Sequence, residues 1–248
     1  MPRIFDNING NSLDLSLDKS DVITIVITNS NFNIHYELSD GDYKFLIFNN
    51  SDSELSLNEE GTIRNSNVEI NYFDLNDAKL IHKNNIEVYY GSNLTINSTY
   101  LGTNTKNIEF NLFNKERDSA ISISNNVVCL NDADFSLTVS GKIEKGSKRS
   151  KCFQKSRCLT FENPKKAKIL PVLLIDENDV EASHSLSSGT IDENVLFYMN
   201  SRGLSKNDAL KLLLVSYLMP NEEFYSAFED GLKIKKIADR KVEKICMM

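Results

Sequence analysis

The chain of 248 residues has no apolar run near the ~20 residues that a membrane-spanning helix needs. Residues 1–6 lack the apolar core of a signal peptide. Positive charge is also scarce, because 28 lysines and arginines stand against 35 acidic residues and leave a net charge of −7. That balance argues against a non-specific nucleic-acid binder, whose surface is basic. We therefore expect a cytoplasmic protein with neither membrane nor nucleic acid as a partner.

Signatures of several enzyme classes are missing too. The sequence has no Walker motif, no Gly-x-Ser-x-Gly and no dinucleotide-binding fingerprint. Its four cysteines form no Cys-x-x-Cys pair and show no zinc-finger spacing. Cys152 and Cys158 would share one face of an extended strand but lie roughly 20 Å apart, too far to bind one metal unless the chain folds back between them. We expect reduced structural thiols and a protein that is not an enzyme.

What the chain does contain is a succession of short β-prone runs between residues 20 and 180, separated by Asn, Asp, Ser and Gly turns. Several runs alternate apolar and polar residues, which indicates half-buried strands. A hydrophobic content of 40% is enough for a sizeable core. The predicted strands are residues 22–28, 43–48, 68–73, 86–90, 108–113, 120–124, 135–139 and 170–175. This region is predicted to be all-β.

The arrangement of these strands is less constrained. Similar triplets begin at Val68, Ile86 and Ile108, at spacings of 18 and 22 residues, which is near one coil of a β-solenoid. A sandwich or jelly roll remains an alternative. The abundant asparagines indicate either stacked side chains at the corners of a solenoid or an AT-biased genome.

After residue 190 the pattern becomes helical. Asp192 is placed to cap a helix that Gly203 can end, and Ser205 with Asp208 forms a capping-box variant for a second helix, which Pro220 ends. Asn221 is predicted to cap a third helix. That helix would carry Phe224, Phe228, Ile234, Ile237, Val242 and Ile245. The chain therefore divides into a β-domain of residues 1–189 and a helical subdomain of residues 190–248.

Two stretches near this boundary carry a distinctive pattern. Residues 180–192 are rich in hydroxyl groups and hold His184, and residues 196–203 read Leu-Phe-Tyr-Met-Asn-Ser-Arg-Gly. Weaker matches are the turn from Gly141 to Gly146, Phe153 and Gln154 ahead of a Ser-Arg-x-Leu strand, and residues 174–180. In this order and spacing they resemble the SufB/SufD family of iron–sulfur cluster assembly scaffold proteins, over roughly residues 134–220.

The resemblance implies a right-handed parallel β-helix followed by a small C-terminal helical subdomain. It also implies a short form without the N-terminal helical domain of longer members. Gln154 is followed by Lys155, where SufB carries a cysteine, and the later motif is Ala182-Ser183-His184. The chain is therefore similar to SufD, although SufD proteins often read Cys-Ser-His-Gly at this motif.

For function, the similarity to SufD implies a subunit that supports cluster assembly or iron acquisition. The implied partners are a SufB-like paralogue in a heterodimer, or a second copy in a homodimer, and a SufC-type ABC ATPase. His184 would be a ligand at the partner interface for a transient iron–sulfur cluster, since neutral imidazole binds iron. The implied ATPase-binding surface comprises Phe197, Tyr198, Arg202, Gly203, Leu210 and Tyr217.

Other interpretations of these residues stay open. His184 could be hydrogen-bonded at a solenoid edge or lie in an interface without metal, and Phe197 and Tyr198 could be core residues that hold the tail on the solenoid. His35 and His82 are predicted to be structural. The acidic residues Asp176, Glu177 and Asp179 are more typical of a solvated turn than of a divalent-metal or acid–base cluster. A structural homodimer or a SufB paralogue without a cluster site, and a carbohydrate-active β-helix, are the competing functions.

Overall fold

The computed structural model describes residues 3–6, 10–51, 53–161, 166–220, 228 and 231–247. Over these residues it has fifteen strands followed by three helices. The strands are β1 (Arg3–Asp6), β2 (Ser12–Leu17), β3 (Asp21–Ile27), β4 (Asn31–Ser39), β5 (Asp42–Asn49), β6 (Leu55–Arg64), β7 (Asn67–Asp74), β8 (Leu80–Val88), β9 (Asn93–Gly102), β10 (Thr105–Asn114), β11 (Ala120–Cys129), β12 (Asp134–Ile143), β13 (Lys151–Thr160), β14 (Lys166–Ile175) and β15 (Glu181–Gly189). The helices are α1 (Glu193–Ser201), α2 (Lys206–Leu218) and α4 (Gly231–Cys246).

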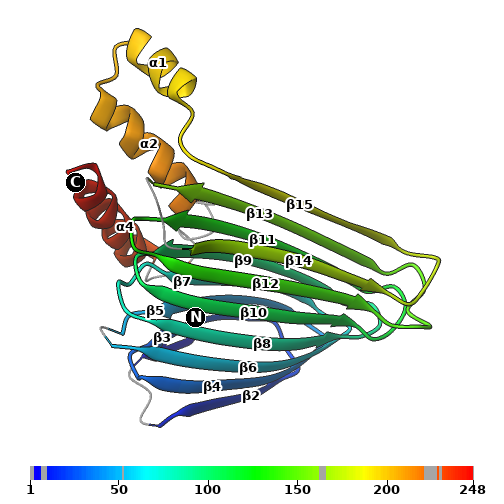
Figure 1. Ribbon diagram of the computed structural model, residues 1–248. Helices are drawn as coiled ribbons and strands as arrows, with labels where there is room; N and C mark the ends of the chain where they lie inside the picture. The colour runs from blue at the N-terminus through cyan, green and yellow to red at the C-terminus, as the bar shows by residue number, and fades with distance from the viewer. Residues whose placement is uncertain are drawn as a thin grey trace.

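Successive strands alternate between two sheets. The odd strands form one sheet in the order β1-β3-β5-β7-β9-β11-β13-β15, and the even strands form the other from β14 to β2. Each pairing is parallel, for example β11 with β13 and β10 with β12. Figure 1 shows the resulting stack of coils, one pair of strands per coil. The predicted β-solenoid is confirmed, and the sandwich and jelly-roll alternatives are wrong because both need antiparallel neighbours.

The coil is longer than the triplet spacing indicated. Hydrogen-bonded side chains on neighbouring coils lie 25 residues apart for Asn67 and Asp42, 26 for Asn93 and Asn67, and 31 for Asn125 and Ser156. The triplets at Val68 and Ile86 lie in different sheets, on β7 and β8. The 18-residue spacing was therefore wrong, because it compared strands that share a coil. The 22-residue spacing compared the neighbouring strands β8 and β10 out of register, since Ile108 pairs with His82 and Ile86 with Leu112.

Stacked asparagines do stabilise the corners. Asn93 donates to Asn67 at 2.7 Å, and Asn67 donates to Asp42 at 2.8 Å, so that one ladder joins the first residues of three odd strands. Each amide offers both a donor and an acceptor, which lets it bond to the coil on either side. The first of the two interpretations of the asparagine content is thereby supported.

Apolar residues fill the space between the sheets. In β4, Phe32, Ile34, Tyr36 and Leu38 point inward and are at most 2% exposed, while the residues between them face solvent. A second apolar cluster lies outside the odd sheet, near the carboxyl ends of its strands. There Leu46, Phe48, Phe73, Leu101, Val128 and Leu159 pack against Leu214, Leu218, Ile234, Ala238 and Val242 of α2 and α4. The helices therefore cover one end of the odd sheet.

The helix ends follow the sequence closely. Asp192 accepts from the backbone N–H of Asn194 at 2.8 Å, and Ser205 accepts from that of Asp208 at 3.1 Å. Gly203 adopts a φ of 93°, in the left-handed region that glycine tolerates best. The prediction that one helix carries both Phe228 and Ile234 was wrong, because α4 begins at Gly231 and Phe228 lies in a bend before it. Asn221 and Phe224 lie outside the described residues.

The last strand ends at Gly189 and α1 begins at Glu193. The division into two domains stays a prediction, since α2 and α4 share a continuous apolar cluster with the solenoid. None of the described helices is long and apolar enough to cross a membrane.

Candidate functional site

The solenoid ends at β14 and β15, which together we call the open end. Each is the outermost strand of its sheet, since β14 pairs with β12 and β15 pairs with β13. All nine residues of β15 are exposed to solvent. Two such edges present a row of backbone donors and acceptors that another chain can pair with.

His184 lies on this open end. The register of β13 and β15 places Ala182, His184 and Leu186 directly above Cys152, Gln154 and Ser156. Those three lower residues face the solenoid interior and are at most 3% exposed. His184 therefore continues an interior row. In the part of the chain that the structure describes, no further coil covers this row, and His184 is exposed at the mouth of the solenoid.

Gln154, the residue paired with His184 on the neighbouring strand, is buried in the solenoid interior. Gln154 donates through Nε2 to the backbone carbonyl of Val172 at 3.0 Å, which ties β13 to β14 across the interior. Its Oε1 is buried and accepts no hydrogen bond from the described residues. A partner donor or a water molecule at the open end would satisfy this atom.

Exposed aliphatic side chains surround the open end. Leu174 is 51% exposed, Leu186 44%, Leu170 42% and Ile175 39%. Single exposed aliphatic residues are ordinary, but four on two adjacent edge strands indicate a surface that another protein covers.

A second exposed surface lies on α1, which has no buried residue. Phe197 is 73% exposed and Tyr198 58%, so their interpretation as core residues is wrong: α1 extends past the carboxyl ends of β13 and β15 and has no sheet beneath it (Figure 1). The Arg202 guanidinium lies 5.3 Å from the centre of the Tyr198 ring. The sequence-predicted ATPase contacts Phe197, Tyr198, Arg202 and Gly203 are thus exposed together.

The other two predicted contacts behave differently. Leu210 and Tyr217 of α2 are half-buried and pack against the apolar cluster under the helices. Arg157 of β13 stacks on Tyr217, with its guanidinium 4.2 Å from the ring centre. These two residues hold α2 on the solenoid, so that α1 carries most of the exposed part of the predicted surface.

Comparison with known proteins agrees with this geometry. The family model for the SufBD core domain, of the SUF system for FeS cluster assembly, matches residues 38–217. The chain belongs to the SufBD family.

Three curated relatives show how far the match extends. The iron–sulfur cluster assembly protein SufD of Bacillus subtilis is 30% identical over 200 residues, which are 76% of this chain and 46% of the relative. A SufBD family protein of Synechocystis is 26% identical over 140 residues, which are 56% of this chain and 28% of the relative. SufD of Escherichia coli is 32% identical over 68 residues, which are 27% and 16% of the two chains. The chain spans less than half the length of these relatives, and the similarity to SufD supports a SufD-like member of the family.

The cysteines of this SufBD chain lie mostly inside the solenoid. All four are free, and Cys129, Cys152 and Cys158 are buried. Burial raises the pKa of Cys152 to about 12, and a hydrogen bond from Cys129 lowers the pKa of Cys158. Over the residues that the structure describes, no three histidine, cysteine or acidic side chains come together as a metal site. An iron ligated by His184 would therefore need its remaining ligands from a second chain or from the cluster's own sulfide.

Inside the solenoid lies a polar network that the sequence did not predict. Glu59 Oε2 accepts hydrogen bonds from the Tyr72 hydroxyl at 2.6 Å, from Asn84 Nδ2 at 2.7 Å and from His82 Nε2 at 2.9 Å. The other ring nitrogen of His82 lies 3.3 Å from the Tyr100 hydroxyl. Burial and the Glu59 carboxylate raise the pKa of Tyr72 well above its usual range. We call these five residues the Glu59 network, and they agree with the structural role predicted for His82.

The remaining candidates stand apart from both surfaces. His35 is exposed and lies 3.9 Å from Glu37. Glu177 accepts from the backbone N–H groups of Asn178 and Gly146. These bonds lower its pKa, as expected of a solvated turn.

Proposed function

We propose that this chain is a SufD-like, non-enzymatic subunit of an iron–sulfur cluster assembly scaffold. It pairs with a SufB-like partner through the open end and binds a SufC-type ATPase through α1. The observation that supports this best is the uncovered interior row at β15, with His184 on it. A solenoid end without a polar cap is a surface that needs covering, and strands of another solenoid would extend both sheets.

In this proposal His184 offers a neutral nitrogen ligand to iron that is cargo. Replacing a thiolate by imidazole removes one negative charge, and the cluster is then bound less strongly than it would be by four thiolates. Such a site suits a scaffold that must release its cluster. Closure of a bound ATPase would pull on α1, which is next to β15 in the chain, and would thereby open the interface at the open end.

A homodimeric interaction protein without a cluster site is the second candidate. Its support is that two copies of the open end carry the same exposed aliphatic residues and the same unpaired edges, so that a two-fold pairing is self-complementary. The two functions differ in whether His184 matters for iron.

The pairing is tested with Leu186→Lys. We expect a charge at the open end to lower the amount of SufB-like partner that co-purifies with the tagged chain about tenfold or more, because a buried unpaired ammonium is costly. The co-expressed SufC-type protein should still co-purify. Ile4→Lys is the matched control, since Ile4 is 41% exposed on β1, the edge strand at the opposite end of the odd sheet. Equal loss of partner with both variants would contradict the proposed interface.

The cluster role is tested with His184→Ala in the same co-expressed complex. We expect intact co-purification and about tenfold lower iron and acid-labile sulfide per complex, because one ligand is gone. Visible absorption of the complex gives a second measure of cluster content. His35→Ala, which removes another exposed imidazole, should leave cluster content unchanged. Cluster content equal to that of the unmodified complex would favour the homodimeric interaction protein, or a scaffold whose ligands lie elsewhere.

A further inference from the structure

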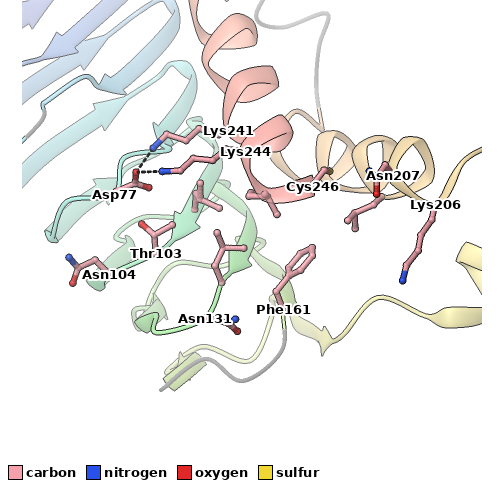
Figure 2. A pocket seen from close by; sticks show the side chains of 14 residues that line it. Asp77, Thr103, Asn104, Asn131, Phe161, Lys206, Asn207, Lys241, Lys244 and Cys246 are labelled. Carbon is pink, nitrogen blue, oxygen red and sulfur yellow. Dashed lines mark ion pairs between the residues drawn. The ribbon is translucent and has the colours of Figure 1, made fainter. Parts of the chain in front are cut away.

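A large pocket lies where the loops after β9, β11 and β13 meet α2 and α4 (Figure 2). Its volume is about 710 Å³, within the range of sites for small molecules and cofactors. Of the residues that were predicted to contact the ATPase, Leu210 lines this pocket, and the α1 residues do not. Its wall is built from described residues between Asp77 and Cys246.

The charge of this pocket is opposite to that of the chain. Lys206, Lys241 and Lys244 line it, and Asp77 is the acidic side chain among the lining residues. Lys241 lies 2.9 Å and Lys244 3.8 Å from the same Asp77 oxygen. Burial alone would raise the pKa of Asp77, but the hydrogen bond and charge of Lys241, with a smaller effect of the Lys244 charge, hold it below its usual value. The pocket lining therefore holds three ammonium groups and one carboxylate, in a protein whose net charge is −7.

The lysines differ in how firmly they are held. Lys241 is 23% exposed and pairs closely with Asp77, whereas the Lys244 side chain is 68% exposed and lies at the limit of an ion pair. Lys244 can therefore turn to an incoming anion without breaking a short contact. Figure 2 shows both ammonium groups pointing toward Asp77 at one end of the pocket, with Lys206 at the other end.

Between these ends the wall is apolar with amide groups at its edges. The apolar residues are Leu101, Leu130, Phe161, Leu210 and Ile245. The amides are those of Asn104, Asn131 and Asn207. An aromatic ring offers a stacking surface for a flat heterocycle, and asparagine amides match the donor and acceptor pattern of a purine edge. Lysine ammonium groups bind phosphate as point charges.

We infer that this pocket binds a nucleoside phosphate, with the heterocycle against the apolar wall and the phosphate groups at Lys241 and Lys244. The inference is separate from the proposed scaffold function, because it uses neither His184 nor the open end. Inorganic phosphate would bind the lysines and make no contact with the apolar wall, whereas a nucleoside would contact the apolar wall and leave the lysines without an anion. Both parts are needed for tight binding.

The test is fluorescence anisotropy of a methylanthraniloyl derivative of ADP with the purified full chain, in the absence of any ATPase. We expect saturable binding that ADP reverses, while adenosine and inorganic phosphate each compete much less well. Lys244→Gln should weaken binding about tenfold, the value of one charged hydrogen bond. Binding should also weaken as salt is raised.

Lys83→Gln is the matched control, since Lys83 is an exposed lysine on β8 outside the pocket lining. Its affinity for the probe should equal that of the unmodified chain, and thermal unfolding should show that both variants fold. Absence of saturable binding up to about 1 mM probe, a very weak affinity, would overturn the inference. So would equal affinities of the Lys244 and Lys83 variants, or competition by phosphate as strong as by ADP.

Discussion

Gly61→Ala is expected to lower the free energy of unfolding by roughly 3 kcal/mol, the range of overpacked cores. Gly61 lies in β6 beside Tyr36 of β4 and Ile86 of β8. A Cβ atom there would overlap the Tyr36 ring, closest to its Cε2 and Cζ atoms. The tyrosine ring occupies the volume that any side chain at Gly61 would need.

The Tyr36 ring cannot easily move away. It is fully buried and stacks on Phe45, with ring centres 5.7 Å apart, so that a shift would displace the next coil as well. The gain from replacing a strand glycine, about 0.5–1 kcal/mol, is smaller than this cost. Urea unfolding followed by circular dichroism measures the difference.

Gly189→Ala provides the matched control. Gly189 also belongs to a strand of the solenoid, but no heavy atom lies within 4 Å of the position that a Cβ atom would take there, so we expect no loss of stability. A second variant, Gly61→Ala combined with Tyr36→Leu, should be less destabilised than the sum of the single changes, because the smaller side chain makes room. Equal stabilities of the Gly61 and Gly189 variants would contradict the packing argument.

Most of the strands that the sequence predicted have apolar residues on the interior row, but such a row was not sufficient, because β4, whose interior row runs from Phe32 to Leu38, was missed too. The run at residues 43–48 became β5, and that at residues 108–113 became part of β10. β6 was missed because its interior row holds Glu59 and Gly61, and β13 because its row holds Gln154 and Ser156. Polar interior residues break the alternation on which strand prediction depends.

The helix ends were predictable because their bonds are local, within three residues for Asp192 and Ser205. The coil length was not, since nothing in one strand shows which distant strand will pair with it. The same reason hid the Glu59 network and the pocket, which join residues from different coils. His184 was found by family resemblance, and the fold added that it lies on an uncovered interior row.

The second large effect is expected for Glu59→Leu, which should lower the free energy of unfolding by about 3–5 kcal/mol. The side chain of Glu59 is wholly buried, and its Oε2 satisfies three donors. Leucine fills a similar volume but leaves the Tyr72 hydroxyl without its acceptor and His82 Nε2 without its partner. Asn84 Nδ2 loses its bond to the carboxylate and keeps the one to the Tyr72 hydroxyl, at 3.0 Å. Each unsatisfied buried group costs about 1–3 kcal/mol.

Glu60→Leu is the control, because Glu60 is the next residue of β6 and faces solvent. It removes the same charge and adds the same side chain, and its effect should stay within about 0.5 kcal/mol. The double variant Glu59→Leu with His82→Leu should unfold with a higher free energy than Glu59→Leu alone. Two apolar side chains leave fewer buried polar groups without a partner than a leucine beside an unpaired histidine does. If the two single variants unfolded at the same urea concentration, the Glu59 carboxylate would not stabilise the interior, and the network would be a tolerated feature of the core. The recovery in the double variant decides how much of the cost lies in the orphaned imidazole.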